Sequence, residues 1–214
     1  MDFNKINLYI NDIYKKSTEL TKREFINKTQ LKDFVPVIDD DVARFLKLII
    51  KITKPENILE IGTSIGYSTT SMAQIVKEYG GKITTIEYDE KVAAQAKLNF
   101  ISAGVEDFIE LKIGNAEKII PDMEEKFDLI FQDVDKRLYP LLFDDCLRIL
   151  KTGGLLIAED TLFPVLDLDE RWHCLIEPIE QFNELVVNCL KLDSTFLPIG
   201  DGLIVAVKKD GRRL

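Results

Sequence analysis

The segment Ile58–Ser68, read as ILEIGTSIGYS, decides the fold of this chain. A short β-type run, Ile58–Ile61, leads into a loop with two glycines, Gly62 and Gly66, and a helix is expected to begin near Ser68. Glycine lets a backbone approach a ligand closely, and the helix offers free N–H groups to an anion. The G-x-x-x-G spacing differs from the G-x-G-x-x-G of dinucleotide sites, so it favours a smaller nucleoside ligand over a nicotinamide dinucleotide.

Short apolar runs alternate with amphipathic stretches of helical spacing from about residue 50 onward. We expect strands over seven runs: 58–61, 82–87, 108–113, 127–131, 155–158, 193–198 and 203–207. The alternation predicts βαβ units, but too few residues join the last two strands for a crossover helix, so they must pair antiparallel. We therefore predict an α/β, Rossmann-like fold. Its doubly wound sheet is seven-stranded and mostly parallel, with a C-terminal antiparallel hairpin and N-terminal helices.

Length and composition indicate one domain of 214 residues with a net charge of −9. We expect residues 1–45 to form a helical extension of two or three helices and residues 46–208 to form the Rossmann-like core. The acidic balance argues against a general nucleic-acid binder. No stretch approaches the ~20 apolar residues of a membrane span, and the N-terminus lacks a signal-peptide pattern. Cys146, Cys174 and Cys189 have no CxxC spacing, which predicts free, buried thiols and a cytoplasmic location.

Two polar residues follow the next expected strands along the chain. Glu87 ends the run KITTIE, about twenty residues beyond the glycine loop, where a carboxylate can accept both ribose hydroxyls of a nucleoside. A solvated loop acid is the alternative. Asn115 stands at the tip of the following strand, where it can hydrogen-bond an adenine edge, although a turn-forming asparagine explains it nearly as well.

Acidic groups follow two buried strands. Asp133-Val134-Asp135-Lys136 comes directly after FDLIF, and Glu159-Asp160 comes directly after LLIA. Neighbouring parallel strands would bring these carboxylates to one edge of the sheet, where they repel unless a hard cation such as Mg²⁺ lies among them. Lys136 can pair with a substrate oxygen or lower its pKa. Separate solvated acids are the alternative, and the single histidine, His173, excludes histidine-rich zinc sites.

Five segments, taken together, carry a resemblance to a known family: ILEIGTSIGYSTTSMA, ITTIEYDE, FDLIFQDVDKRLYPLLFD, GGLLIAEDTLF and LPIGDGL. In order and spacing they resemble the cation-dependent O-methyltransferases, which include the catechol and caffeoyl-CoA O-methyltransferases and their bacterial relatives. The similarity covers roughly residues 35–208. It implies a fold of the class I methyltransferase type and S-adenosylmethionine as the methyl donor. It also implies a divalent cation as a second cofactor, Mg²⁺ with Mn²⁺ or Ca²⁺ as alternatives.

The resemblance also implies which residues bind the methyl donor. Glu87 corresponds to the ribose-binding acid, and Val37 to a residue that lines the cofactor entrance. The remaining expected cofactor residues lie around the methionine part, beside the ribose and adenine, or in the same loops: Glu60, Gly62, Thr63, Tyr67, Ser68, Tyr88, Asn115, Ala116 and Asp133.

The resemblance further implies that Asp133 is the first metal ligand and Lys136 the catalytic lysine. Glu159 and Asp160 fall where most relatives carry Asp-Asn and would complete the metal site. Glu159 is one methylene longer than aspartate, and Asp160 adds a charge where an amide is usual. Three acids can still bind a divalent cation, but they can equally mark a branch that has lost or changed the metal.

The reaction implied is direct methyl transfer to a hydroxyl of a small, catechol-like acceptor. One alternative is a tRNA wobble-uridine hydroxyl methyltransferase, whose branch the segments INLYIND and VPV resemble and which the basic tail 208–213 would suit. Against it, residues 163–180 hold five Asp/Glu and only Arg171 as a firm cation. Another alternative is a cofactor-binding protein that has lost catalysis. A homodimer is expected through the N-terminal helices and Phe163–Leu168.

Overall fold

The structure is a computed structural model, and it describes residues 3–15, 17 and 19–210. The basic tail predicted at 208–213 therefore lies outside the described residues from Gly211 onward. Within the described ranges, no helix combines the length and the apolar character that a membrane crossing requires.

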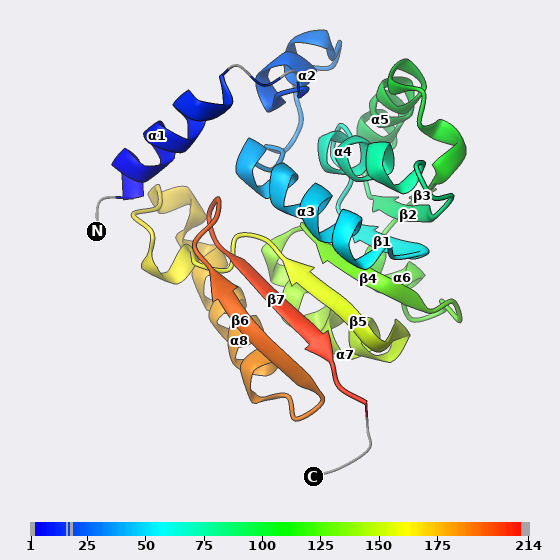
Figure 1. The fold of residues 1–214 in the computed structure, drawn as a ribbon. Coiled ribbons are helices and arrows are strands. Elements are labelled where there is room, and N and C mark those ends of the chain that lie inside the picture. Colours follow the sequence, from blue (N-terminus) through cyan, green and yellow to red (C-terminus); the bar gives the residue numbers. More distant parts are fainter. Residues whose placement is uncertain (1–2, 16, 18, 211–214) are drawn as a thin grey trace.

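A seven-stranded sheet forms the centre of the molecule, with strand order β3-β2-β1-β4-β5-β7-β6 (Figure 1). The strands are β1 (Asn57–Ile61), β2 (Lys82–Glu87), β3 (Ile109–Ile113), β4 (Phe127–Gln132), β5 (Leu150–Ala158), β6 (Leu192–Leu197) and β7 (Leu203–Lys208). Strands β1 to β5 pair in parallel, whereas β7 runs antiparallel to both β5 and β6. The predicted mostly parallel sheet with a C-terminal antiparallel hairpin is confirmed.

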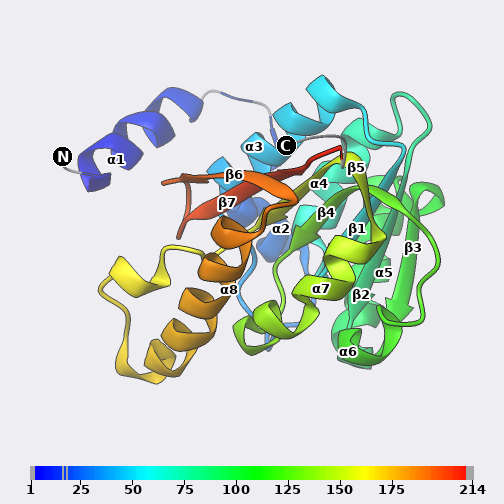
Figure 2. The same ribbon diagram turned by 90° about the horizontal axis from the view of Figure 1, so that it is seen from below.

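Helices cover both faces of this sheet (Figures 1 and 2). The α-helices of the described residues are α1 (Phe3–Tyr14), α2 (Lys22–Lys28), α3 (Asp40–Thr53), α4 (Tyr67–Val76), α5 (Glu90–Ala103), α6 (Ala116–Ile119), α7 (Tyr139–Ile149) and α8 (Ile176–Asn188), and α1 projects away from the sheet. Helices α3, α4 and α5 lie on one face, and α6, α7 and α8 lie on the other. Helix α3 crosses residue 45, where the N-terminal extension was expected to end, and packs on α4.

Alternation along β1 explains why the sheet carries two hydrophobic cores. Ile58 packs with the α3–α5 core, whereas Leu59 and Ile61 pack with the α6–α8 core, and all three are fully buried. A parallel strand buried on both faces must be apolar at nearly every position, which is the pattern ILEI shows. The one polar member, Glu60, is also fully buried and faces the α4 side.

Two predictions about local structure are wrong. Strand β5 begins at Leu150 and includes Lys151-Thr152-Gly153-Gly154, whereas the expected strand covered only 155–158. The pairing of β4 with β5 shifts register between Phe127 and Leu129, so the strand reaches back past its glycines. Of the three cysteines expected to be buried, Cys146 is buried but Cys174 is exposed.

Candidate functional site

The carboxyl ends of β1, β2, β4 and β5 lie side by side and are joined by backbone hydrogen bonds. Gly62 N–H donates to Ile86 O (3.1 Å), Asp133 N–H to Ile61 O (2.9 Å), and Glu159 N–H to Gln132 O (3.1 Å). The glycine loop, Asp133 and Glu159 therefore meet at one edge of the sheet, where ligands bind in open α/β folds.

Gly62 is the point at which the glycine loop touches the segment that carries Asp133. Its φ is +99°, and a Cβ there would lie 2.0 Å from the carbonyl oxygen of Asp133. No other residue fits this position, because a side chain would collide with backbone and the φ is unfavourable for L-residues. The loop can run this close to Asp133 only as glycine.

The start of α4 is shaped to bind an anion. Gly66 is its N-cap, with φ +86° and no side chain, and no side chain of the described residues caps the first turn. A helix leaves its first N–H groups without intrahelical partners, and they carry the positive end of the helix dipole. The carboxylate of an amino-acid group fits such a site.

Glu87 extends from the end of β2 to the glycine loop, as predicted. Its two carboxylate oxygens accept from Ser64 N–H (2.8 Å) and Asp89 N–H (3.0 Å). Burial raises the pKa of this carboxyl, although the backbone bonds oppose the rise. The neighbouring Tyr88 is 75% exposed.

Asn115 and Ala116 begin helix α6, beyond the end of β3. The Asn115 side-chain oxygen accepts from Glu117 N–H (2.9 Å), so this residue caps the helix, and Ala116 is buried. The alternative explanation, that Asn115 is a local turn-forming residue, accounts for the hydrogen bond that its side-chain oxygen accepts. Its place at a strand end still puts it at the same edge of the sheet as Glu87.

Four of the predicted cofactor residues in or beside the glycine loop are buried, namely Glu60, Thr63, Tyr67 and Ser68. The Glu60 carboxylate accepts from the hydroxyls of Thr69 and Thr85, and the Thr85 hydroxyl also lies 2.6 Å from that of Thr63. Burial raises the pKa of Glu60 to about 7, while the hydroxyls of Ser68, Thr69 and Thr85 hold it lower than burial alone would. The buried network ties β1, β2 and α4 together beneath the loop.

The segment between α2 and α3 runs along the glycine loop, a feature the sequence did not reveal. Ser64 Oγ donates to Val35 O (2.9 Å), and Asn99 Nδ2 of α5 donates to both Thr29 Oγ1 (3.1 Å) and Ile65 O (2.9 Å). Val37, the predicted lining residue of the cofactor entrance, is buried two residues after this contact. The N-terminal part of the chain thus borders the loop.

Three carboxylates converge beside the glycine loop, as the sequence predicted. One oxygen each of Asp133, Glu159 and Asp160 lies within 4.8 Å of the others. Lys136 Nζ, on a nearly buried side chain, contacts Asp133 Oδ1 at 2.8 Å and Asp160 Oδ2 at 2.7 Å. The cluster holds three acids against one paired lysine.

Burial and the neighbouring charges both shift the pKa values of this cluster. Burial raises the pKa of Asp133 to about 6 even beside Lys136, and burial together with Asp160 raises the pKa of Glu159 well above its usual range. Burial lowers the pKa of Lys136, but Asp133, Tyr139 and Asp160 more than offset this, so the lysine keeps its proton. Carboxylate oxygens of this kind are the ligands that a hard divalent cation binds.

Tyr139 holds Lys136 in place, a role that the spacing K-x-x-Y could have suggested. Its hydroxyl accepts from Lys136 Nζ (3.1 Å) and lies 2.9 Å from Gln132 O and 3.1 Å from Glu159 O. The fully buried ring packs edge-on against Phe182 of α8 at 5.1 Å between centroids. Tyr139 thereby links the lysine to the ends of β4 and β5.

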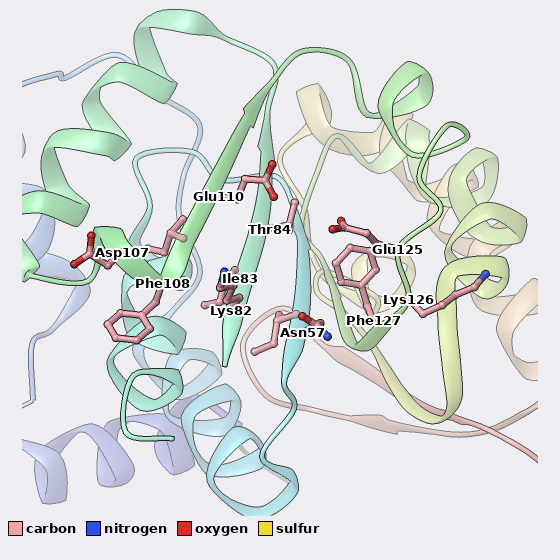
Figure 3. A pocket seen from close by; sticks show the side chains of 12 residues that line it. Asn57, Lys82, Ile83, Thr84, Asp107, Phe108, Glu110, Glu125, Lys126 and Phe127 are labelled. Atoms are coloured by element: carbon pink, nitrogen blue, oxygen red, sulfur yellow. The ribbon is translucent and has the colours of Figure 1, made fainter. Parts of the chain in front are cut away.

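A hollow of about 510 Å³ lies at the opposite edge of the sheet (Figure 3). Asn57, Lys82 and Phe127, the first residues of β1, β2 and β4, line it together with Glu125 and Lys126 of the preceding loop. Ligands of open parallel sheets bind at the carboxyl ends of strands, so we do not assign this hollow to the site.

Similarity to known proteins agrees with this geometry. A family model described as O-methyltransferase matches residues 11–209. The chain belongs to the O-methyltransferase family. This confirms the predicted class, an S-adenosylmethionine-dependent O-methyltransferase.

Relatives of this O-methyltransferase act on different acceptors, as their names state. It is 32% identical over 182 residues to a catechol O-methyltransferase from Niastella koreensis, covering 80% of this chain and 82% of that protein. It is also 32% identical to a caffeoyl-CoA O-methyltransferase from Populus kitakamiensis, covering 79% and 75%. An O-methyltransferase from Bacillus cereus, solved in complex with SAH, superimposes with a TM-score of 0.75 at 28% identity, covering 96% and 97%.

The buried Glu60 makes stability depend on pH. Its folded pKa is about 7 and its ordinary value 4.5, so between these pH values the folded state binds a proton that the unfolded state lacks. The contribution of Glu60 to the free energy of unfolding is therefore largest below pH 4.5, and it falls by roughly 3 kcal/mol as the pH rises to 7. Glu60→Gln should remove this loss. In urea unfolding at pH 5 to 8, the free energy of unfolding of the variant should therefore increase relative to that of wild type as the pH rises.

The exposed Glu110→Gln is the control for this measurement and should follow the wild-type profile. Parallel pH profiles for Glu60→Gln and wild type would show that Glu60 does not change its protonation on folding.

Proposed function

We propose that this O-methyltransferase moves the methyl group of S-adenosylmethionine onto a hydroxyl of a small, catechol-like acceptor, with a divalent cation held by Asp133, Glu159 and Asp160. The observation that carries the proposal is the contact at Gly62, which joins a nucleoside-binding loop to a cluster of three carboxylates and a lysine. Methyl donor and acceptor must lie in line within one site, and this edge of the sheet offers both halves.

The donor's three parts each have a partner in the proposed site. Glu87 would accept the ribose hydroxyls, and the open start of α4 would bind the methionine carboxylate. Asn115 and Ala116 would border the adenine, with Val37 at the entrance. Glu60 and Thr63, because they are buried, would act by fixing the loop rather than by touching the donor.

The carboxylate cluster fits the proposed cation. The departure from Asp-Asn to Glu159-Asp160 leaves three oxygen donors within 4.8 Å of one another. Burial, together with the nearby carboxylates of Asp160 and Asp133, raises the pKa of Glu159, and a cation bound among these oxygens would favour its ionised form. Mg²⁺ suits these ligands, as do Mn²⁺ and Ca²⁺. A cation there would lower the pKa of a bound acceptor hydroxyl and orient its oxygen.

Lys136 would act at the acceptor oxygen. During transfer the S–CH₃ bond breaks, an O–CH₃ bond forms, and the hydroxyl proton must leave. Paired with Asp133 and Asp160, Lys136 is an ammonium that stabilises negative charge on that oxygen. It can accept the proton only when those two carboxylates are neutralised by another positive charge.

A small acceptor is supported by the Niastella relative, which is named for catechol. The Populus relative, named for caffeoyl-CoA, has equal identity, so the choice is a proposal about this chain. The direct test is methyl transfer to catechol and to caffeoyl-CoA.

Two substitutions separate donor binding from chemistry. Glu87→Ala removes the expected hydrogen bonds to ribose, so calorimetric titration should show donor binding weakened about 10- to 100-fold. Asp133→Ala should bind the donor within about three-fold of wild type while turnover falls at least about 100-fold. The reverse pattern would show that the two subsites are wrongly assigned.

Removal of the cation should abolish turnover without abolishing donor binding. Methyl transfer to catechol should be lost in EDTA and restored by excess Mg²⁺, whereas the donor dissociation constant should change little. Turnover that survives chelation would reject the cation but keep the methyltransferase. Donor binding with no transfer to any hydroxyl acceptor, metal present, would favour a protein that has lost catalysis.

We also propose a homodimer through α1. Ile6, Tyr9 and Ile13 follow helical spacing and are 38%, 68% and 59% exposed, so they form an apolar stripe open to a second copy. Light scattering should give about twice the 24.5 kDa chain mass, and Tyr9→Glu should halve it. Asn11→Glu, on the polar side of α1, is the control, and a monomeric wild type at micromolar concentration contradicts the proposal.

A further inference from the structure

Consecutive acids at the start of α3 bind three different parts of the molecule. Asp39 Oδ1 pairs with Lys22 Nζ at 2.8 Å, and Asp40 Oδ1 accepts from Lys22 N–H and from the Tyr67 hydroxyl. Asp41 Oδ2 accepts from Gly200 N–H at 3.3 Å. The first turn of α3 thus contacts α2, α4 and the β6–β7 turn.

Asp40 makes the shortest of these contacts. A single carboxylate oxygen accepts from Lys22 N–H and Tyr67 Oη, each at 2.6 Å. Hydrogen bonds to an ionised acceptor are about twice as strong as neutral ones. Burial and the Asp40 carboxylate both raise the pKa of Tyr67, so its hydroxyl stays protonated and donates.

The same tyrosine is enclosed by α2. Its ring lies 5.3 Å from that of Phe25, tilted by 55°, and its hydroxyl also reaches Leu20 O at 3.3 Å. Tyr67 is 2% exposed and is the first residue of α4, directly after the N-cap Gly66. A shift of Asp40 or of α2 would therefore displace the start of α4, where the donor is proposed to bind.

Acidic residues at a helix N-terminus are common, because they favour the helix dipole. That explanation does not account for Asp40, whose hydrogen-bonded oxygen points to α2 and α4 rather than to the first turn of its own helix. Asp41 does bond locally, to Val42 N–H at 2.8 Å. The direction of the Asp40 side chain suggests a link between elements.

We propose that Asp40 is a positioning residue for methyl-donor binding: through Tyr67 and Lys22 N–H it fixes the start of α4 and holds α2 against it. The inference rests on the proposed donor site at the start of α4. Asp40 does not touch the donor. It acts by keeping the first-turn N–H groups of α4 in the orientation that binds the donor's carboxylate.

A double-mutant cycle tests the link. Asp40→Ala and Tyr67→Phe should each raise the dissociation constant of S-adenosylmethionine, measured by calorimetry, by about ten-fold. Both substitutions remove the same hydrogen bond. The dissociation constant of the double variant should therefore lie within about two-fold of that of Asp40→Ala. Asp40→Asn retains an acceptor oxygen and should restore binding to within about three-fold of wild type.

Asp39→Ala is the matched control, since it removes an exposed contact to the same Lys22 and should leave donor affinity within two-fold. Trypsin should cleave α2 at Lys22 or Arg23 faster in Asp40→Ala than in Asp39→Ala. Wild-type donor affinity in Asp40→Ala, or effects of Asp40→Ala and Tyr67→Phe that multiply, would overturn the proposal.

Two further outcomes are interpretable. If Asp40→Ala does not fold, the cycle is run with Asp40→Asn and Tyr67→Phe, and multiplying effects again overturn the link. If wild type itself fails to bind the donor, the proposed donor site is wrong. Donor binding that no substitution of the pair affects would reject only the role of Asp40.

Discussion

The close approach of Gly62 to the carbonyl of Asp133 is the constraint on which the rest of the site depends. With 2.0 Å between that oxygen and the place a Cβ would take, the glycine loop and the acidic segment can meet only because the side chain is absent. Backbone bonds from Gly62, Asp133 and Glu159 then set the strand ends in one row. The proposed donor site and the carboxylate cluster are adjacent for this reason.

Charge balance is the second condition. Lys136 bridges Asp133 and Asp160, and Tyr139 anchors it to the ends of two strands. Glu159 is one methylene longer than aspartate and Asp160 replaces an amide by a carboxyl group, yet one oxygen of each still lies within 4.8 Å of Asp133. The departure from the family pattern is therefore compatible with the proposed cation, because three carboxylate oxygens are still grouped closely enough to share one ion.

Periodicity was enough to predict most of the fold, because strands buried on both faces are apolar throughout and their helices are amphipathic. It failed at β5, where Lys151 and two glycines lie within a strand whose pairing with β4 shifts register. The start of such a strand is stabilised by its pairing with β4 rather than by its own side chains. Exposure of Cys174 was missed for a similar reason, since packing of the η4 turn (Glu170–Leu175) has no periodic signal.

The sequence by itself determined the mostly parallel sheet and the polar residues that follow its strands, including the carboxylates. It could do so because a parallel fold places the carboxyl ends of its strands at one edge. Only the tertiary structure decided how those residues are used. Glu60 and Tyr67 stand in the signature segment, yet both are buried and bonded to Thr85 and Asp40. Their partners lie far away in the chain, so no local pattern could show that they support the loop from behind.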